Sequence, residues 1–380
     1  MARLARVEVF AADEIAIVHV MNRTVRRCFL FGFDTVSGKN YDHRKQWIDD
    51  QLKQQAMYFG IDLLSYSILS NHFHAMLRSR PDIVREWSDN EVARRWLMLC
   101  PRLRDEQRRP IEPTEFEINR IVNNPQKLAA IRNRLSDISW WMRLLSQHIA
   151  QRANREDGEI GKFFQARYRA VRMLDETAVL ACSAYIDLNP VRARQARTVD
   201  TSDYTSAQLR ARDLQARSVS PPVDSAVNPA ASATTEFPSD GNPSATMSLD
   251  KARHLAPIDL QEGTTTPGPD AHAGGDRCSN KGFLPMSTEQ YLELLNWTAR
   301  RVVHDKSELT PPQVVSLLQR SGLSDDTWCG LVRDFGRLFS LVAGKPHQIE
   351  TYRPARRAES TPASHRHRVR CQLRELFSRP

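Results

Sequence analysis

The chain is most constrained by one predicted β-hairpin, residues 61–77, which carries two histidines separated by a single phenylalanine. Successive side chains of a β-strand point to opposite faces of the sheet. His72 and His74 should therefore share one face, while Phe73 and Ala75 share the other. We expect the apolar face to pack on helices and the other face to present two imidazoles side by side.

Two neutral imidazoles on one strand face suit a metal ion. With His72 and His74 as ligands, the ion would keep positions for a third ligand and for a substrate. A chance pair of histidines on a polar strand face gives the same spacing, and the spacing alone does not decide between these two interpretations.

A second informative stretch, residues 185–193, lies at the end of a helix predicted for residues 176–188. Residues four apart on a helix share a face, so Tyr185 and Asn189 should point the same way, and Pro190 should end the helix. A phenol, an amide, two histidines and arginines suggest phosphodiester chemistry, in which tyrosine attacks phosphorus and cations neutralise the developing charge. A core tyrosine, a capping asparagine and surface arginines are the structural alternative.

Four stretches, in this order, resemble motifs of the single-tyrosine HUH transposases, meaning the insertion-sequence type and the relatives associated with repetitive extragenic palindromes. The stretches are residues 19–23, 70–74, 141–169 and 185–193. The resemblance covers residues 12–210, interrupted by a predicted helical insertion at about 80–135. Ser70 stands where the family usually has proline, and Asn189 stands where many members have glutamine.

The resemblance implies an α+β, ferredoxin-like fold (the HUH nuclease domain), with the histidines on the central strand of an antiparallel sheet and the tyrosine on a nearby helix. It implies a metal-dependent, transposase-like enzyme that cleaves and rejoins single-stranded DNA. Tyr185 would form a 5′-phosphotyrosine intermediate, and Mg²⁺ or Mn²⁺ would sit on His72, His74 and Asn189. The arginines expected to contact DNA are Arg23, Arg167, Arg169 and Arg192.

Other interpretations stay open. A domesticated DNA-binding protein would act on palindromic repeats without turnover, although an intact His72, His74 and Tyr185 favour retained chemistry. A replication initiator or relaxase usually carries more ligand histidines, and a metallohydrolase would need further His or Asp ligands, for which we find no cluster. A second tyrosine, Tyr168, is expected to serve in strand packing or base stacking. The partner would be single-stranded or hairpin DNA, and the protein a monomer or a homodimer.

Composition predicts the rest of the domain organisation. Residues 218–282 are rich in Pro, Ser, Thr, Ala, Gly and Asp, and we expect a disordered linker because such a segment buries little apolar area. Residues 287–342 are predicted to form a small helical unit, and residues 353–380 a basic tail. The net charge of +9 favours a polyanionic partner such as nucleic acid.

The sequence also predicts where the protein works. No stretch approaches the roughly 18 consecutive apolar residues of a membrane-spanning helix, so we expect no membrane partner. The first residues lack an apolar signal core and soon reach Asp13 and Glu14. Six cysteines are scattered singly, without the paired spacing of a zinc or redox site. These features predict a cytoplasmic protein with reduced thiols, acting at the nucleoid.

Overall fold

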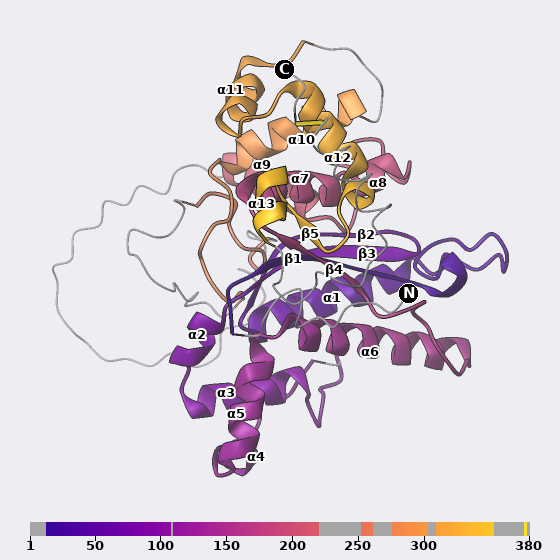
Figure 1. Ribbon diagram of the computed structural model, residues 1–380. Coiled ribbons are helices and arrows are strands. Elements are labelled where there is room, and N and C mark those ends of the chain that lie inside the picture. Colours follow the sequence, from indigo (N-terminus) through magenta and orange to yellow (C-terminus); the bar gives the residue numbers. More distant parts are fainter. Residues whose placement is uncertain are drawn as a thin grey trace, which may run out of the picture.

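The computed structural model describes residues 13–107, 109–219, 252–260, 276–302, 309–352 and 376–377. These residues form a mixed α+β fold in which one sheet separates two layers of helices (Figure 1). The strands are β1 (Ile17–Arg23), β2 (Ile61–Ile68), β3 (His72–Ser79), β4 (Arg169–Met173) and β5 (Val342–Ala343).

The strand order is β2-β3-β1-β4-β5. The pairs β2–β3, β3–β1 and β1–β4 are antiparallel, whereas β5 pairs with β4 in parallel. The sheet is therefore mixed, and the prediction of an antiparallel sheet holds for its first four strands only. The middle strand is β1, so the histidines of β3 lie one strand away from the expected central position.

The hairpin of β2 and β3 confirms the predicted division of faces. Phe73, Ala75 and Leu77 are fully buried in the core beneath the sheet, and Met76 is buried in the separate core above it. Alternation along the strand then places His72 and His74 on the upper face with Met76.

Two long helices cover the lower face of the sheet, α1 (His43–Tyr58) and α6 (Ile138–Asp157) (Figure 1). α1 buries Ile48, Leu52 and Ala56 at the four-residue spacing of one helix face. A 3₁₀ turn, η2 (Val25–Arg27), precedes α1.

The predicted insertion at 80–135 is mostly helical, as expected, and it lies beyond α1 and α6 (Figure 1). Three of its four helices begin at a capping side chain; Thr114, for example, forms a capping box with Glu117. The four helices are α2 (Pro81–Glu86), α3 (Asp89–Leu99), α4 (Glu115–Val122) and α5 (Pro125–Leu135).

The upper layer is built around α7 (Glu176–Asp187) and shares one apolar core with the upper face of the sheet. The segment predicted as a small separate unit, 287–342, packs into this same core, with Leu294, Leu317 and Phe335 all buried there. The other upper helices are α8 (Asn189–Arg192), α9 (Ser206–Val219), α10 (Thr288–Val302), α11 (Pro312–Arg320), α12 (Asp325–Leu338) and α13 (Pro346–Thr351).

Most of the predicted linker, 218–282, lies outside the described residues, but two of its stretches, 252–260 and 276–282, are described. Leu255 is buried and pairs with Leu63 of β2, and Arg78 of β3 donates to the carbonyl oxygen of Gly282 at 2.8 Å. The prediction of a linker is corrected for these two stretches, which pack on the sheet. Of the predicted basic tail, only Leu376 and Phe377 are described.

Among the described residues, none of the helices is both long and apolar enough to span a membrane. The described cysteines are Cys28, Cys100, Cys182, Cys278 and Cys329, and all five are free thiols.

Candidate active site

Three histidines from neighbouring strands lie together on the upper face of the sheet. His19 of β1 and His74 of β3 stack with ring centroids 5.1 Å apart, and His19 Nε2 lies 2.8 Å from His74 Nδ1. His72 lies edge-on to His74 at 5.0 Å, and its Nδ1 is 2.6 Å from Asn71 Oδ1. These contacts engage the Nδ1 atoms of both predicted ligands, so each Nε2 remains for another partner.

The three imidazoles are neutral at neutral pH. Burial lowers the pKa of His19 to about 3, with a further contribution from the positive charge of Arg169. Burial also lowers the pKa of His72 to about 3, and the nearby Arg23 adds to the effect. The pKa of His74 lies well below its ordinary value, first because of burial. Neutral imidazole is the form that binds metal ions.

Tyr185 of α7 points at this histidine cluster. Its ring lies edge-on to His74 at 5.6 Å and to His19 at 6.0 Å between ring centroids. The guanidinium carbon of Arg192 lies 4.9 Å from the centre of the same ring. We call His19, His72, His74, Tyr185 and Arg192 the tyrosine site.

The helix of Tyr185 is anchored from behind by Asp187, a fully buried carboxylate two residues later. Asp187 accepts hydrogen bonds from the Ser206 hydroxyl at 2.5 Å, the Ala207 amide at 3.1 Å and the Tyr291 hydroxyl at 2.7 Å. Residues two apart on a helix are about 200° apart around its axis, so this anchor faces away from Tyr185. Burial raises the pKa of the Asp187 carboxyl, although Arg210 and the hydrogen bonds oppose that rise.

Asn189 lies beyond a break in the helix. α7 ends at Asp187, and α8 begins at Asn189 with Pro190 in its first turn, where proline's missing N–H is not needed. The predicted helix, 176–188, is therefore confirmed to within one residue, but Asn189 before the proline is helical, because it begins α8. Asn189 is 9% exposed, and its role as a third metal ligand stays a prediction.

Three of the four predicted DNA-contacting arginines gather near the tyrosine site. Arg23 pairs in register with His72, Arg169 lines a small cavity with His19 and Tyr185, and Arg192 lies over the tyrosine ring. Arg167 is placed elsewhere, because it lines a cavity of about 550 Å³ on the α6 side of the sheet together with Tyr168. The hydroxyl of Tyr168 is 3.2 Å from Ser139 Oγ of α6, so this second tyrosine belongs to the lower layer.

Four of the predicted site residues have a buried nitrogen atom without a hydrogen-bond partner. In the described part of the chain, buried polar atoms that lack a partner include Arg23 Nε, His74 Nε2, Asn189 Nδ2 and Arg192 Nη1. Folded proteins pair the large majority of their buried polar groups, so each exception needs a reason. Three of these four groups are hydrogen-bond donors, and the fourth is a neutral imidazole nitrogen that can bind a metal ion through its lone pair.

Two contributors to the site were not predicted. His19 lies in one of the recognised motifs, and its alternation with Val18 and Val20 along β1 is the signal that could have placed it on the histidine face. Phe335 of α12 stacks on Tyr185 with ring centroids 5.4 Å apart and planes at 30°. Nothing in the sequence near Phe335 indicates this long-range contact.

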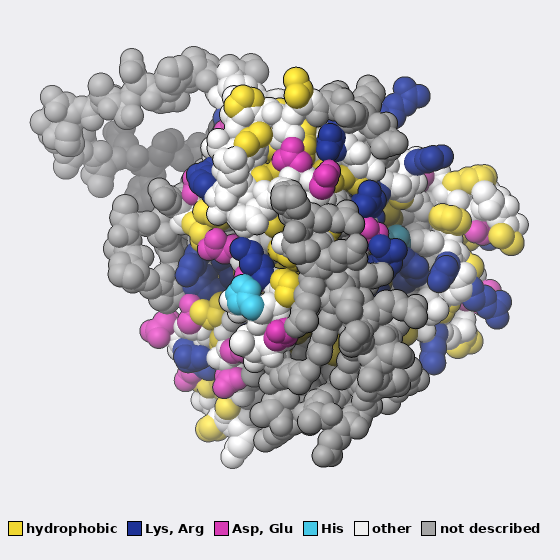
Figure 2. Space-filling view, turned by 45° about the horizontal axis from the view of Figure 1, so that its top comes forward, with side chains coloured by type: hydrophobic (Ala, Val, Ile, Leu, Met, Phe, Trp, Pro, Cys, Tyr) yellow, Lys and Arg dark blue, Asp and Glu magenta, His cyan; other side chains and the backbone are white. Residues whose placement is uncertain are grey.

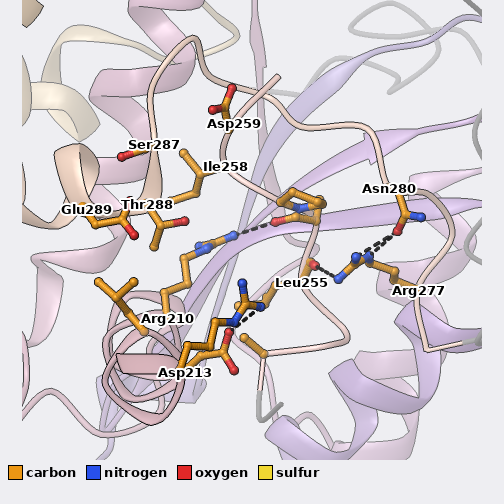
Figure 3. A pocket seen from close by; sticks show the side chains of 15 residues that line it. Arg210, Asp213, Leu255, Ile258, Asp259, Arg277, Asn280, Ser287, Thr288 and Glu289 are labelled. Atoms are coloured by element: carbon orange, nitrogen blue, oxygen red, sulfur yellow. Dashed lines mark hydrogen bonds and ion pairs between the residues drawn. The ribbon is translucent and has the colours of Figure 1, made fainter. Parts of the chain in front are cut away.

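Another cavity of about 340 Å³ lies between α9, the stretch 252–260 and the start of α10 (Figure 3). Arg210 and Asp213 of α9, Arg277, and Glu289 of α10 are among the residues that line it. Arg210 donates from Nη2 to the carbonyl oxygens of Leu64 and Ala256 and so ties α9 to β2 and to the stretch 252–260. This cavity contains none of the tyrosine-site residues.

Comparisons with known proteins add a weak structural likeness. No family model and no curated protein sequence matches this chain. A solved structure of a REP-associated tyrosine transposase bound to a REP hairpin is similar to 63% of this chain and to 100% of its own, with 13% sequence identity and a TM-score of 0.32.

Among the described residues, no group of three or more His, Cys, Asp and Glu side chains forms a metal centre. Function is therefore inferred from the site residues themselves.

Proposed function

We propose that this chain is a tyrosine strand-transferase that cleaves and rejoins single-stranded DNA through a 5′-phosphotyrosine intermediate. The observation that carries the proposal is one site where the Tyr185 ring meets two stacked neutral histidines and the guanidinium of Arg192, whose Nη1 is buried without a partner. A buried donor without a partner costs stability, so one that lies beside a tyrosine and two histidines favours a bound anion as its partner.

The donors suit a phosphodiester. Arg23 and Arg192 carry positive charge, and burial lowers the pKa of both guanidinium groups, which marks them as poorly solvated cations. Such cations gain most from an anionic oxygen that replaces the lost water. A phosphate oxygen between them would also meet the charge that develops during attack at phosphorus.

Tyr185 supplies the nucleophile. Its phenolic oxygen would attack phosphorus, forming the tyrosine–phosphate ester and breaking the bond from phosphorus to the 3′ oxygen. The phenol loses one proton in this step, and the leaving 3′ oxygen gains one to become a 3′-hydroxyl, so the protons balance. In the reverse step a 3′-hydroxyl attacks the ester and releases the tyrosine.

The residues present also fit a divalent metal ion. His74 Nε2 is buried without a partner, the imidazoles are neutral, and Asn189 offers an amide oxygen. His72, His74 and Asn189 would hold Mg²⁺ or Mn²⁺, as the family resemblance implies. When bound, the ion would polarise a phosphate oxygen.

The fold supports the same proposal. The order β2-β3-β1-β4, with α1 between β1 and β2 and α6 between β3 and β4, is the arrangement expected of a ferredoxin-like βαββαβ domain. DNA would approach a basic surface, since Lys and Arg side chains gather on the right-hand side of the face seen in Figure 2. Single-stranded or hairpin DNA is the proposed partner.

The test is formation of a covalent adduct. Purified protein is incubated with labelled single-stranded hairpins taken from the flanks of its own gene, with Mg²⁺ or Mn²⁺, and resolved on a denaturing gel. We expect a metal-dependent adduct that disappears in Tyr185→Phe and persists in the matched control Tyr168→Phe. His74→Ala should lose the adduct but keep hairpin binding within a few-fold.

Two results would overturn the proposal. An adduct that persists in Tyr185→Phe would refute the assignment of the nucleophile. Hairpin binding without any adduct, across several flanking sequences and both metals, would favour the alternative, a DNA-binding protein that acts on palindromic repeats without turnover.

A further inference from the structure

We propose that α12 is a cover that closes the tyrosine site, and that single-stranded DNA must displace it before Tyr185 can attack. This inference rests on the function proposed above and adds how that site is regulated. Its basis is a set of contacts between the C-terminal helices and the tyrosine site.

The first contact is aromatic. Phe335 of α12 stacks on the Tyr185 ring at 5.4 Å and also lies edge-on to His19 at 6.3 Å between ring centroids. Phe335 is 1% exposed. Its ring therefore fills the space above both the proposed nucleophile and the histidine that contacts His74.

The second contact is made by Gly336. A Cβ atom placed on Gly336 would lie 2.8 Å from the Tyr185 hydroxyl oxygen, so the backbone of α12 lies directly against the attacking atom. Only the absence of a side chain lets the two approach so closely. No phosphorus can lie in line with that oxygen on the side that Gly336 occupies.

The cavity that remains is too small for a substrate. The space bounded by α12, His19, His74 and Tyr185 measures about 20 Å³. A cavity of this size holds about one water molecule. A phosphodiester with its two flanking nucleotides cannot enter while α12 is in this position.

Arg192 links the cover to the site. Its Nη2 donates to the carbonyl oxygen of Arg333 on α12 at 2.5 Å, while its Nη1 is buried without a partner. A DNA phosphate at the tyrosine site would compete with this carbonyl for the same guanidinium, and an anionic oxygen is the stronger acceptor. Substrate binding would thus weaken the polar bond between α12 and the tyrosine helix.

Contacts at both ends restrict how α12 can move. Near its start, Trp328 Nε1 donates to Thr298 Oγ1 of α10 at 2.8 Å. Just after its end, Leu341 accepts a hydrogen bond from the amide of Arg172 in β4 at 2.9 Å. Opening therefore takes the form of a shift of the Phe335–Gly336 turn away from α7, with the helix still attached at its ends.

The test measures the exposure of Tyr185 and the chemistry separately. Phe335→Leu removes the stacking while keeping an apolar side chain, and Gly336→Ala places a methyl group against the hydroxyl. Gly330→Ala is the matched control, because it makes the same change on α12 but faces Leu376 instead of Tyr185. Full-length proteins are treated with tetranitromethane without metal or DNA, and nitration of Tyr185 is followed by mass spectrometry, with Tyr41 as the internal reference.

We expect Tyr185 nitration to rise about three- to tenfold in Phe335→Leu, as expected for loss of one aromatic pair, and to rise in Gly336→Ala. It should stay unchanged in Gly330→Ala. The rate of DNA adduct formation should rise in the same two variants. The cover is refuted if nitration is unchanged in both, or if the adduct forms more slowly in both, since α12 would then be a fixed wall that positions the tyrosine.

The two proposals fail in different ways. Faster nitration with no DNA adduct in any variant would support the cover and refute the strand-transferase. An adduct that forms at the same rate in all four proteins, with nitration also unchanged, would support the strand-transferase and refute the cover.

Discussion

Tyr291→Phe tests the anchor that holds the tyrosine helix. The hydroxyl of Tyr291 on α10 donates to the Asp187 carboxylate of α7 at 2.7 Å, and both residues are fully buried. The substitution removes one oxygen atom and leaves the ring and its packing unchanged. The carboxylate keeps its bonds to Ser206 and Ala207 but loses one of three donors.

The expected cost follows from this geometry. A buried hydrogen bond to a charged group contributes about 1.5–3 kcal/mol to stability. Burial already raises the pKa of Asp187, and the Tyr291 hydroxyl is one of the groups that oppose this rise. Its removal should therefore lower the free energy of unfolding by about 1.5–3 kcal/mol and raise the pKa of Asp187 further.

Urea unfolding at neutral pH measures this cost. The matched control is Tyr204→Phe, because the Tyr204 hydroxyl lies on the surface and makes a long 3.5 Å contact with Gln46. Surface changes of this kind are usually within about 0.5 kcal/mol. If Tyr291→Phe loses no more stability than Tyr204→Phe, Asp187 is not the anchor of the tyrosine helix.

Two further predictions concern packing and pH. Gly282→Ala should lower the free energy of unfolding by about 3 kcal/mol or more, because its Cβ would lie 1.8 Å from the backbone oxygen of Asp259 and cannot turn away. Gly38→Ala, where φ is +70° and space is open, should lower it by roughly 1–2 kcal/mol in the same urea assay. Burial lowers the pKa of His254 to about 3 from 6.5, so below pH 6.5 the unfolded chain binds a proton that the folded chain does not. The free energy of unfolding should decrease as the pH is lowered below 6.5, by up to about 1.4 kcal/mol per pH unit. His254→Gln should lose this contribution to the slope, and an unchanged slope would refute the assignment.

Local patterns predicted the parts of the site that share one element. Strand alternation placed His72 and His74 on one face, and the helix that carries Tyr185 was expected from residue 176 and begins there. The helical character of the insertion was also predicted. These features follow from the spacing of apolar and polar residues within one helix or strand, so a short stretch of sequence is enough to predict them.

Contacts between distant segments were not predictable in this way. The stretch 252–260 looks like linker by composition, yet it pairs with β2 through Leu63 and Leu255. Tyr185 and Phe335 are separated by 150 residues, and neither neighbourhood shows that the two rings stack. Arg167 and Arg169 were both expected to contact DNA, but Arg167 precedes β4 and Arg169 begins it, and the two line different cavities.

The unpaired donors and the cover are energetically linked. While α12 is closed, Arg23 Nε, Asn189 Nδ2 and Arg192 Nη1 are buried without partners, and each such group costs about 1–3 kcal/mol. A phosphate that enters the site would pair with these donors and recover part of that cost. The same binding would sacrifice the stacking of Phe335 on Tyr185, worth about 0.5–1.5 kcal/mol beyond its buried area, and the Arg192–Arg333 bond. Pairing of these donors would offset part of the cost of opening, and a smaller anion that reaches fewer of them would offset less.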